Sequence, residues 1–303
     1  MRTIIVGLPL FAERLANSLS EFDPTNRYTF LNTYYSKKDK LKARFMIPRA
    51  DLLFSINGSI VSSGVFDLAI KKKIPIVMNW VGTDVLLATE AFKSGIFRKD
   101  YVDYATHFCE VSWIQDELKA IGIEAEIVNF ASFDRVFDLQ LPNTDRLTVL
   151  SYIAKIRSDF YGIDNFLKAA ERLPEIDFLI AGTEAEEYAP LPSNVRALGW
   201  VQDMQKVYDQ THVCVRMPEH DGLSTFILES LARGKQVIYK YPFNHSYVCE
   251  TEDELVMRLK ELEQDLKSGN WKENTEGASF IREHFNKERI LGDLLQRIKT
   301  VVQ

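Results

Sequence analysis

The stretch RMPEHDGLSTFILESLARGKQVIY at residues 216–239 brings together residue types that bind anions and sugar hydroxyls. It predicts a tight loop around Gly222 between an apolar strand and a helix. The first backbone amides of that helix, over 223–225, have no acceptor within the helix, and with the helix dipole they suit a diphosphate. Glu229 lies one turn further and can accept hydrogen bonds from two neighbouring hydroxyls, such as those of a ribose. Asp221 precedes the loop, where it can meet a sugar hydroxyl or orient the reacting centre.

Charge is unevenly spread along the 303 residues, of which 46% are hydrophobic and 26% charged. The net charge of −6 disfavours general nucleic-acid binding. Residues 1–75 nevertheless hold 12 Lys and Arg against 6 Asp and Glu, a local charge of +6, which leaves −12 for the remainder. Much of the basic excess lies in 34–49, interleaved with apolar residues. That segment is either a solvated helix and loop, or a contact for an anionic membrane surface or acceptor.

The three cysteines, Cys109, Cys214 and Cys249, are isolated and show no C-x-x-C spacing. This usage suits a reducing cytoplasm and disfavours a structural metal site. The five histidines show no metal-ligand spacing either. No apolar run approaches the ~20 residues that span a bilayer, and the first residues predict a strand rather than a signal peptide. We therefore expect a cytoplasmic protein without a bound metal, with peripheral contact at the inner membrane surface through 34–49 as the alternative.

Short β-branched runs alternate with amphipathic stretches in both halves of the chain. This alternation predicts an α/β protein of two Rossmann-like domains, each with a doubly wound parallel sheet. Strands are predicted at 2–7, 28–34, 50–56, 74–80, 106–112, 124–130, 147–153, 176–182, 194–200, 212–217 and 236–241. The longer helices are predicted at 60–72, 84–104, 112–121, 254–267 and 275–301.

Turn-forming residues at 129–146 break this rhythm, and we place the domain boundary there. The predicted division is a first Rossmann-like domain at 1–140, a second at 141–280 and a terminal helix at 281–303. Open parallel sheets bind ligands beyond the carboxyl ends of their strands. Two such domains facing a central cleft suit a two-substrate transfer that must exclude water.

The spacing Asp221-x7-Glu229, followed by SLARGKQVI, resembles the E-x7-E region of glycosyltransferase family 4, which are retaining enzymes of the GT-B fold. The resemblance implies that 1–140 is the acceptor-side domain, that 141–280 binds the nucleotide sugar and that the terminal helix at 281–303 packs at their junction. It also implies that Glu229 holds the nucleotide ribose and that Ser224 and Thr225 lie against the diphosphate. Asp221 takes the place of the first Glu, near the donor sugar, with a side chain one methylene shorter. The order R-x-P-x-x-D-G resembles a variant within the same superfamily, which makes Arg216 a further phosphate contact.

Residues 151–174, SYIAKIRSDFYGIDNFLKAAERLP, resemble the strand, basic loop and helix in which an Arg and a Lys of this family clamp the diphosphate. The chain departs from the family spacing, because Ile156 and Tyr161 occupy the expected positions. We therefore predict Lys155 and Arg157 as the cations that stabilise the leaving group. The catalytic residues are predicted to be Asp221, Lys155, Arg157 and Glu229. The donor site is predicted to contain Arg216, Gly222, Leu223, Ser224, Thr225, Glu229, Gly199 and Val201.

NWVGTDV at 79–85 resembles the H-G-[ST]-D stretch of the family. Asn79 takes the place of a His that often contacts the donor sugar, and Trp80 is predicted to stack on a sugar face. Asp84 either binds sugar hydroxyls or caps its helix. The glycine-pair loop that the family commonly has after its first strand is absent, so acceptor binding stays open. The sugar and acceptor cleft is predicted to include Gly7, Leu8, Asn79, Trp80, Asp84 and His220.

These motifs predict a hexosyltransferase of polysaccharide biosynthesis that uses a nucleoside-diphosphate sugar, with UDP favoured. A glycan, lipid-linked or protein-linked acceptor, retention, and no metal or cofactor are expected. The alternatives are nucleotide-sugar epimerisation or hydrolysis on the same fold, and a catalytically weakened partner subunit that binds a sugar nucleotide or glycan. Neither a G-x-G-x-x-G nor a G-x-x-x-x-G-K-[ST] motif occurs, which disfavours dinucleotide oxidoreductases and P-loop enzymes.

Overall fold

A computed structural model describes residues 1–133, 137, 139, 141–142, 144–188 and 190–302. Its contacts divide the chain into two compact units. The first unit comprises Met1–Ser132, Asp221–Leu223 and Lys287–Gln303, and the second comprises Phe133–His220 and Ser224–Asn286. The predicted boundary after residue 140 falls on a residue outside the described ones, so the exact division stays a prediction.

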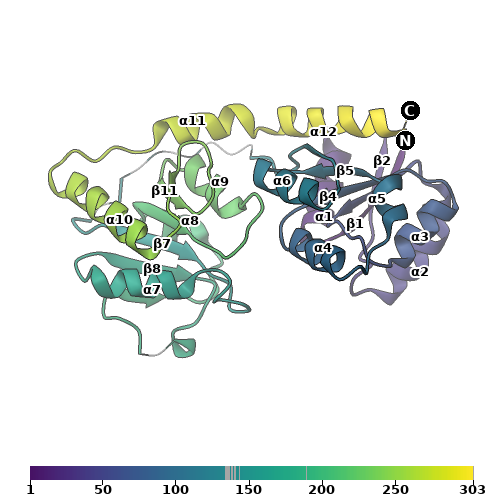
Figure 1. The fold of residues 1–303 in the computed structure, drawn as a ribbon. Helices are drawn as coiled ribbons and strands as arrows, with labels where there is room; N and C mark the ends of the chain where they lie inside the picture. Colours follow the sequence, from purple (N-terminus) through teal and green to yellow (C-terminus); the bar gives the residue numbers. More distant parts are fainter. Residues whose placement is uncertain (134–136, 138, 140, 143, 189, 303) are drawn as a thin grey trace. The chain divides into compact units, whose positions relative to one another are not determined.

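The first unit is built on a six-stranded parallel sheet in the order β2-β1-β3-β4-β5-β6 (Figure 1). Its strands are β1 (Arg2–Gly7), β2 (Arg27–Phe30), β3 (Leu52–Ile56), β4 (Ile76–Trp80), β5 (Thr106–Cys109) and β6 (Ala125–Ile127). The chain passes from β1 to one side and then returns to β3 on the other. The strand order therefore reverses between β1 and β3, which is where open α/β sheets bind ligands.

Helices cover both faces of this sheet. They are α1 (Pro9–Phe22), α2 (Lys37–Met46), the 3₁₀ turn η1 (Ile47–Arg49), α3 (Gly64–Lys71), α4 (Thr83–Lys93), α5 (Lys99–Tyr104), α6 (Ser112–Ala120) and α12 (Lys287–Val302). Val6 and Met78 join a core with buried residues of α2, α3, α4 and α6. Their strand neighbours Ile5 and Val77 are also fully buried. Since successive strand residues point to opposite faces, both faces are apolar, as expected of a sheet covered by helices.

The second unit contains another six-stranded parallel sheet, in the order β12-β11-β10-β7-β8-β9. Its strands are β7 (Thr148–Tyr152), β8 (Asp177–Ala181), β9 (Val195–Ala197), β10 (Val213–Arg216), β11 (Gln236–Tyr239) and β12 (Tyr247–Val248). Its helices are α7 (Ile163–Arg172), the 3₁₀ turn η2 (Ala185–Glu187), α8 (Met204–Tyr208), α9 (Thr225–Ala232), α10 (Glu252–Lys267) and α11 (Thr275–His284). Here the strand order reverses between β7 and β10. The predicted fold class, two doubly wound parallel sheets, is confirmed.

Two helices that the sequence predicts as continuous are interrupted. The predicted helix at 84–104 ends with α4, because Gly95 adopts a left-handed backbone (φ +68°) that stops the helix. The predicted helix at 275–301 divides into α11 and α12. Asn286 Nδ2 donates to the carbonyls of Arg282 and Glu283, which satisfies two acceptors at the end of α11. None of the described helices has both the length and the apolar composition needed to cross a bilayer.

Candidate functional site

The predicted diphosphate cations lie at the point where the strand order of the second sheet reverses. Lys155 and Arg157 follow the carboxyl end of β7, and Arg216 ends β10. Because β7 and β10 are neighbouring parallel strands, their carboxyl ends share one edge of the sheet. The structure therefore brings these three cations to the same edge, where parallel sheets bind their ligands.

The loops that follow β7 and β10 are packed tightly against each other. The Glu219 amide donates to the Phe160 carbonyl at 2.7 Å. Gly162 has a left-handed backbone (φ +82°), and an added Cβ there would lie 2.2 Å from the Met217 carbonyl oxygen. The Arg157 guanidinium lies 4.0 Å from the centre of the Phe160 ring. These contacts hold the β7 loop, and with it Arg157, in a defined position next to the β10 loop.

Lys155 and Arg157 differ in whether a protein carboxylate already neutralises their charge. Lys155 Nζ pairs with Glu187 Oε1 at 2.7 Å, and this hydrogen bond raises the Lys155 pKa. Arg157 is exposed and forms no ion pair within the described part of the chain. Its backbone is left-handed (φ +65°), a conformation unusual for a residue with a side chain and often found at functional sites. We therefore expect Arg157 to contribute more to anion binding than Lys155.

Helix α9 begins at Thr225, as the sequence predicts. Ser224 occupies the N-cap position, but its side chain makes no capping hydrogen bond. Ser224 is 7% exposed and Thr225 is half-buried, so little of this helix start is open to a ligand. Glu229 lies one turn after Thr225 on the same helix face, where the Tyr208 hydroxyl donates to Glu229 Oε2 at 3.4 Å.

Gly199 lies just after β9, where its backbone pairs with the segment that follows β8. Its amide donates to the Thr183 carbonyl, and its carbonyl accepts from the Gly182 amide at 2.7 Å. An added Cβ at Gly199 would lie 2.4 Å from Glu184 Oε1. Gly199 and the half-buried Val201 thus lie at the same sheet edge as the cations. Their predicted place beside the nucleotide base stays a prediction.

The carboxylate of Asp84 is occupied by backbone amides. It is 4% exposed and accepts hydrogen bonds of 2.7–3.2 Å from Gly58, Val81, Gly82 and Val85. Burial raises the Asp84 pKa, while these amide hydrogen bonds lower it. The sequence left two roles for Asp84, capping its helix or binding sugar hydroxyls. These contacts match the first role, because they hold the residues at the start of α4. Both oxygens are engaged, so a role in binding sugar hydroxyls is not supported.

The predicted stacking of Trp80 on a sugar is wrong. Its side chain has no exposed surface, and its indole Nε1 donates to His107 Nδ1 at 3.1 Å. An added Cβ at Gly58 would lie 2.1 Å from the indole ring, so the loop after β3 packs directly on it. Trp80 belongs to the core of the first unit. The preceding residue, Asn79, also has no exposed surface, and neither polar atom of its side chain has a hydrogen-bond partner among the described residues.

The remaining predicted cleft residues belong to different environments. Gly7 (φ +106°) ends β1, where an added Cβ would lie 2.0 Å from the Ile56 carbonyl oxygen. Leu8, half-buried, donates its amide to the same oxygen at 2.8 Å. His220 is buried, with its ring centre 6.5 Å from that of Tyr241.

Asp221, Gly222 and Leu223 are grouped with the first unit by their contacts, unlike Ser224 and Thr225. The Asp221 carbonyl accepts a hydrogen bond from Trp113 Nε1 at 2.8 Å. From the sequence we predict that 221–225 forms one continuous loop that binds the ligand. The structure instead groups 221–223 with the first unit, and Ser224 and Thr225 with the second.

Glu110 is a buried acid that was not among the residues predicted from the sequence. It directly follows β5, is 7% exposed, and its Oε1 has no hydrogen-bond partner among the described residues. Burial raises its pKa to about 8, and the charge of Asp84 acts in the same direction, whereas a hydrogen bond from the Phe130 backbone opposes them. A single acid at the end of the apolar strand THFC was the available sequence signal.

We expect Glu110 to contribute a stability that decreases as the pH rises. The folded protein retains this proton up to about pH 8, whereas the unfolded chain releases it near pH 4.5. Between these values the folded state binds more protons, so the free energy of unfolding decreases as the pH rises. Glu110→Gln should remove this decrease and raise the free energy of unfolding at pH 8.5 on the order of 2 kcal/mol. Urea denaturation at pH 5, 7 and 8.5 measures it, with the exposed Glu124→Gln as control. Parallel pH profiles for wild type and Glu110→Gln would contradict the assignment.

Residues 148–264 match the family model described as Glycosyl transferases group 1. Apart from 221–223, this match lies within the second unit. It begins at the start of β7 and ends within α10, so the matched segment includes Lys155, Arg157, Arg216 and the whole of α9.

Solved structures confirm that the chain has the GT-B glycosyltransferase fold. A glycosyltransferase from Rickettsia africae superimposes with a TM-score of 0.72 at 12% identity, covering 100% of this chain and 99% of the other. Anabaena HepE in complex with UDP and glucose gives 0.70 at 10% identity, covering 99% and 100%. The pneumococcal O-GlcNAc transferase GtfA in complex with UDP and GlcNAc gives 0.59 at 14% identity, covering 89% and 61%. No curated protein matches this chain by sequence.

Proposed function

We propose that this protein is a group 1 glycosyltransferase that transfers a hexose from a UDP-hexose to a hydroxyl of a glycan, lipid-linked or protein-linked acceptor. The observation that carries the proposal is the gathering of Arg157, Lys155 and Arg216 at the β7/β10 edge. This edge lies inside the segment that matches the family. HepE is solved with UDP and glucose, and GtfA with UDP and GlcNAc, which supports a UDP-sugar as the donor.

In the proposed reaction Glu229 accepts hydrogen bonds from the ribose hydroxyls. Arg157, Lys155 and Arg216 stabilise the negative charge that grows on the diphosphate as the anomeric C–O bond breaks. The acceptor hydroxyl attacks the anomeric carbon on the side that the diphosphate leaves, so the configuration is retained. Its proton passes to a departing phosphate oxygen. This route needs neither a protein base nor a metal ion.

Glu229→Ala tests the nucleotide assignment. The wild type should bind UDP more tightly than 2′-deoxy-UDP, because the deoxy compound lacks one of the hydroxyls that the carboxylate accepts. The variant should bind UDP about 10-fold more weakly, the loss expected for one hydrogen bond to a charged group. It should also lose its preference for UDP over 2′-deoxy-UDP. Isothermal calorimetry with both nucleotides measures these effects.

Glu171→Ala is the matched control, because Glu171 is an exposed acid on α7 of the same unit. It should leave both affinities unchanged. If Glu229→Ala binds UDP as tightly as the wild type, Glu229 does not hold the ribose.

The pairing of Lys155 with Glu187 favours a second candidate, a partner subunit with weakened catalysis that still binds a sugar nucleotide. Titration with UDP, GDP and dTDP, followed by analysis of products from UDP-glucose alone, separates the candidates. A hydrolase or epimerase converts the donor by itself. A transferase binds UDP and releases little of it until an acceptor is added, whereas the partner subunit binds UDP and transfers no sugar even with an acceptor present.

Helix α2 supports peripheral contact of 34–49 with an anionic membrane. Leu41 and Phe45 are 54% and 61% exposed on a helix that also bears several exposed lysines. Exposed apolar side chains flanked by cations are the pattern of helices that lie at a membrane interface.

A further inference from the structure

A cavity of about 650 Å³ opens at the point where the strand order of the first sheet reverses. Gly7 at the end of β1 and Asn57 just after β3 line its floor. Its walls come from α2, the loop 58–63, the start of α3 and α4. A concave site of this size at the carboxyl ends of parallel strands has the position and the volume of a small-molecule site.

Two cations of α2 line this cavity. Lys40 and Arg44 lie one turn apart on the same helix face, together with Ala43 and Ile47, which are also lining residues. Neither Lys40 nor Arg44 forms an ion pair within the part of the chain that the structure describes. Lys42, which is not a lining residue, instead pairs with Asp39 at 3.1 Å. Both lining cations of α2 therefore lack a protein counter-ion among the described residues.

No acid among the described lining residues presents a free carboxylate that could neutralise Lys40 and Arg44. Asp84 is the only acid among its described lining residues. Four backbone amides occupy the Asp84 carboxylate, as described above. Burial raises the pKa of Tyr34, and Asp84 acts in the same direction, so this lining phenol stays protonated and can donate a hydrogen bond.

The serine-containing loop 58–63 adds neutral donors and leads into α3. Ser59, Ser62 and Ser63 all line the cavity. Ser63 occupies the N-cap position of α3, but its side chain makes no capping hydrogen bond. The first amides of α3, which have no acceptor within the helix, therefore lie beside the two cations in one cavity.

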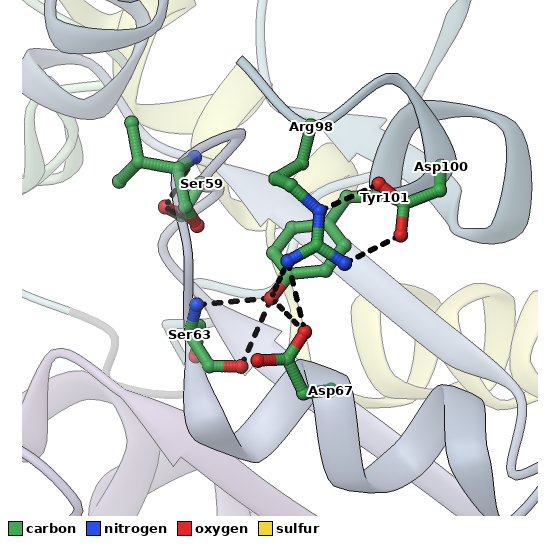
Figure 2. A network of polar contacts seen from close by, with 7 residues as sticks. Ser59, Ser63, Asp67, Arg98, Asp100 and Tyr101 are labelled. Carbon is green, nitrogen blue, oxygen red and sulfur yellow. Dashed lines mark hydrogen bonds and ion pairs between the residues drawn. The ribbon is translucent and has the colours of Figure 1, made fainter. Parts of the chain in front are cut away.

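Figure 2 shows how this loop is held in place. The Tyr101 hydroxyl donates to Asp67 Oδ1 at 2.6 Å and accepts from the Ser63 amide at 2.9 Å. Arg98 bridges Asp67 and Asp100 at 3.1 and 2.6 Å. A loop fixed by its own contacts loses little freedom when it binds a ligand, which favours affinity.

The backbone at the floor of the cavity is held in an uncommon conformation. Asn57 has φ +129°, which is rare for a residue other than glycine. The next amide, of Gly58, donates to Asp84 Oδ2 at 2.7 Å. Ser55 Oγ donates to the Asn57 carbonyl at 2.8 Å. Such strain persists where the surroundings fix it, and it is concentrated at ligand sites.

We propose that this cavity binds a phosphate ester carried by the acceptor. The inference rests on the proposed function and names the chemical class of its second substrate. A phosphate presents several strong acceptor oxygens and a charge near −2. Two free cations, hydroxyls and helix-start amides match those needs better than they match a neutral sugar. Apolar lining residues such as Phe66, Val61 and Leu87, the last two 45% and 62% exposed, provide contacts for the rest of the acceptor.

The test compares two double variants of α2 in the full chain. Lys40→Ala with Arg44→Ala removes the lining cations. Lys37→Ala with Lys38→Ala removes two exposed cations of the same helix that do not line the cavity. Calorimetry with glycerol 3-phosphate represents a soluble ester. Co-sedimentation with phosphatidylcholine vesicles, with and without phosphatidylglycerol, represents a lipid headgroup.

We expect the 40/44 variant to lose at least 10-fold in affinity for the probe that the wild type binds, and the 37/38 variant to lose less than 2-fold. Binding of glycerol 3-phosphate identifies a soluble ester, and binding to the phosphatidylglycerol vesicles alone identifies a lipid headgroup. Equal losses in both variants, or no binding of either probe, would overturn the proposal. UDP affinity measured on the same proteins reports separately on the donor site, so the two proposals can fail independently.

Discussion

Replacing Gly162 with alanine is expected to lower the free energy of unfolding by about 3 kcal/mol. Gly162 has φ +82°, which a side chain disfavours, and an added Cβ would lie 2.2 Å from the Met217 carbonyl oxygen. Neither cost can be relieved by a rotamer change, because both involve the backbone. The β7 loop must therefore move away from the β10 loop. We expect a lower urea midpoint and weaker UDP binding in the same variant.

Gly269→Ala separates the two causes. Gly269 also has a left-handed backbone (φ +71°), but no atom lies within 4 Å of an added Cβ. It should therefore lose only about 1 kcal/mol, the backbone cost alone. Equal losses for Gly162→Ala and Gly269→Ala would show that the contact with Met217 contributes nothing. Urea denaturation of both variants under identical conditions decides between these outcomes.

Replacing Arg157 with alanine is expected to weaken UDP binding about 10- to 100-fold, the effect of removing a charge-assisted hydrogen bond. Arg157 is the cation after β7 that no described acid neutralises, and the Phe160 ring supports its guanidinium at 4.0 Å. Because the proposed contact is with the diphosphate, affinity for UMP should fall much less than affinity for UDP. Calorimetry with both nucleotides measures this difference.

Arg196→Ala provides the control, since Arg196 is an exposed arginine of the same unit whose guanidinium donates to Gln210 Oε1 at 2.9 Å. It should leave both affinities unchanged. Arg157→Lys retains the charge but not the planar fork, so it should recover part of the lost UDP affinity. If Arg157→Ala loses UDP and UMP affinity equally, the side chain does not act on the terminal phosphate.

The order of the elements could be predicted because local patterns determine it. The β-branched runs at 2–7 and 147–153 predicted β1 and β7, and DGLST predicted that a helix begins near 225. These predictions depend on periodicity and turn chemistry within a few residues. The two interrupted helices show the limit of that information. Gly95 gave a local signal for the end of α4, whereas the end of α11 depends on where the side chain of Asn286 turns.

The candidate site was only partly predictable. Motif spacing placed Lys155, Arg157 and Arg216 on loops after strands, and the sheet order then brought them to one edge. The ion pair between Lys155 and Glu187 joins residues of separate loops, so the sequence around either residue does not predict it. The cavity beside Lys40 and Arg44 likewise needs four separate elements to close around it.

The sequence alone determined two α/β halves and a loop-to-helix motif typical of group 1 glycosyltransferases. Both could be predicted because they depend on residue patterns within short stretches of the chain. The tertiary structure decided which polar groups remain available. Trp80 and Asn79 are neighbours on an almost wholly apolar strand, and such a strand does not reveal which of its faces meets a ligand. Asp84 is engaged by amides from two loops. Whether a side chain is free depends on residues distant in the chain, and only folding brings those together.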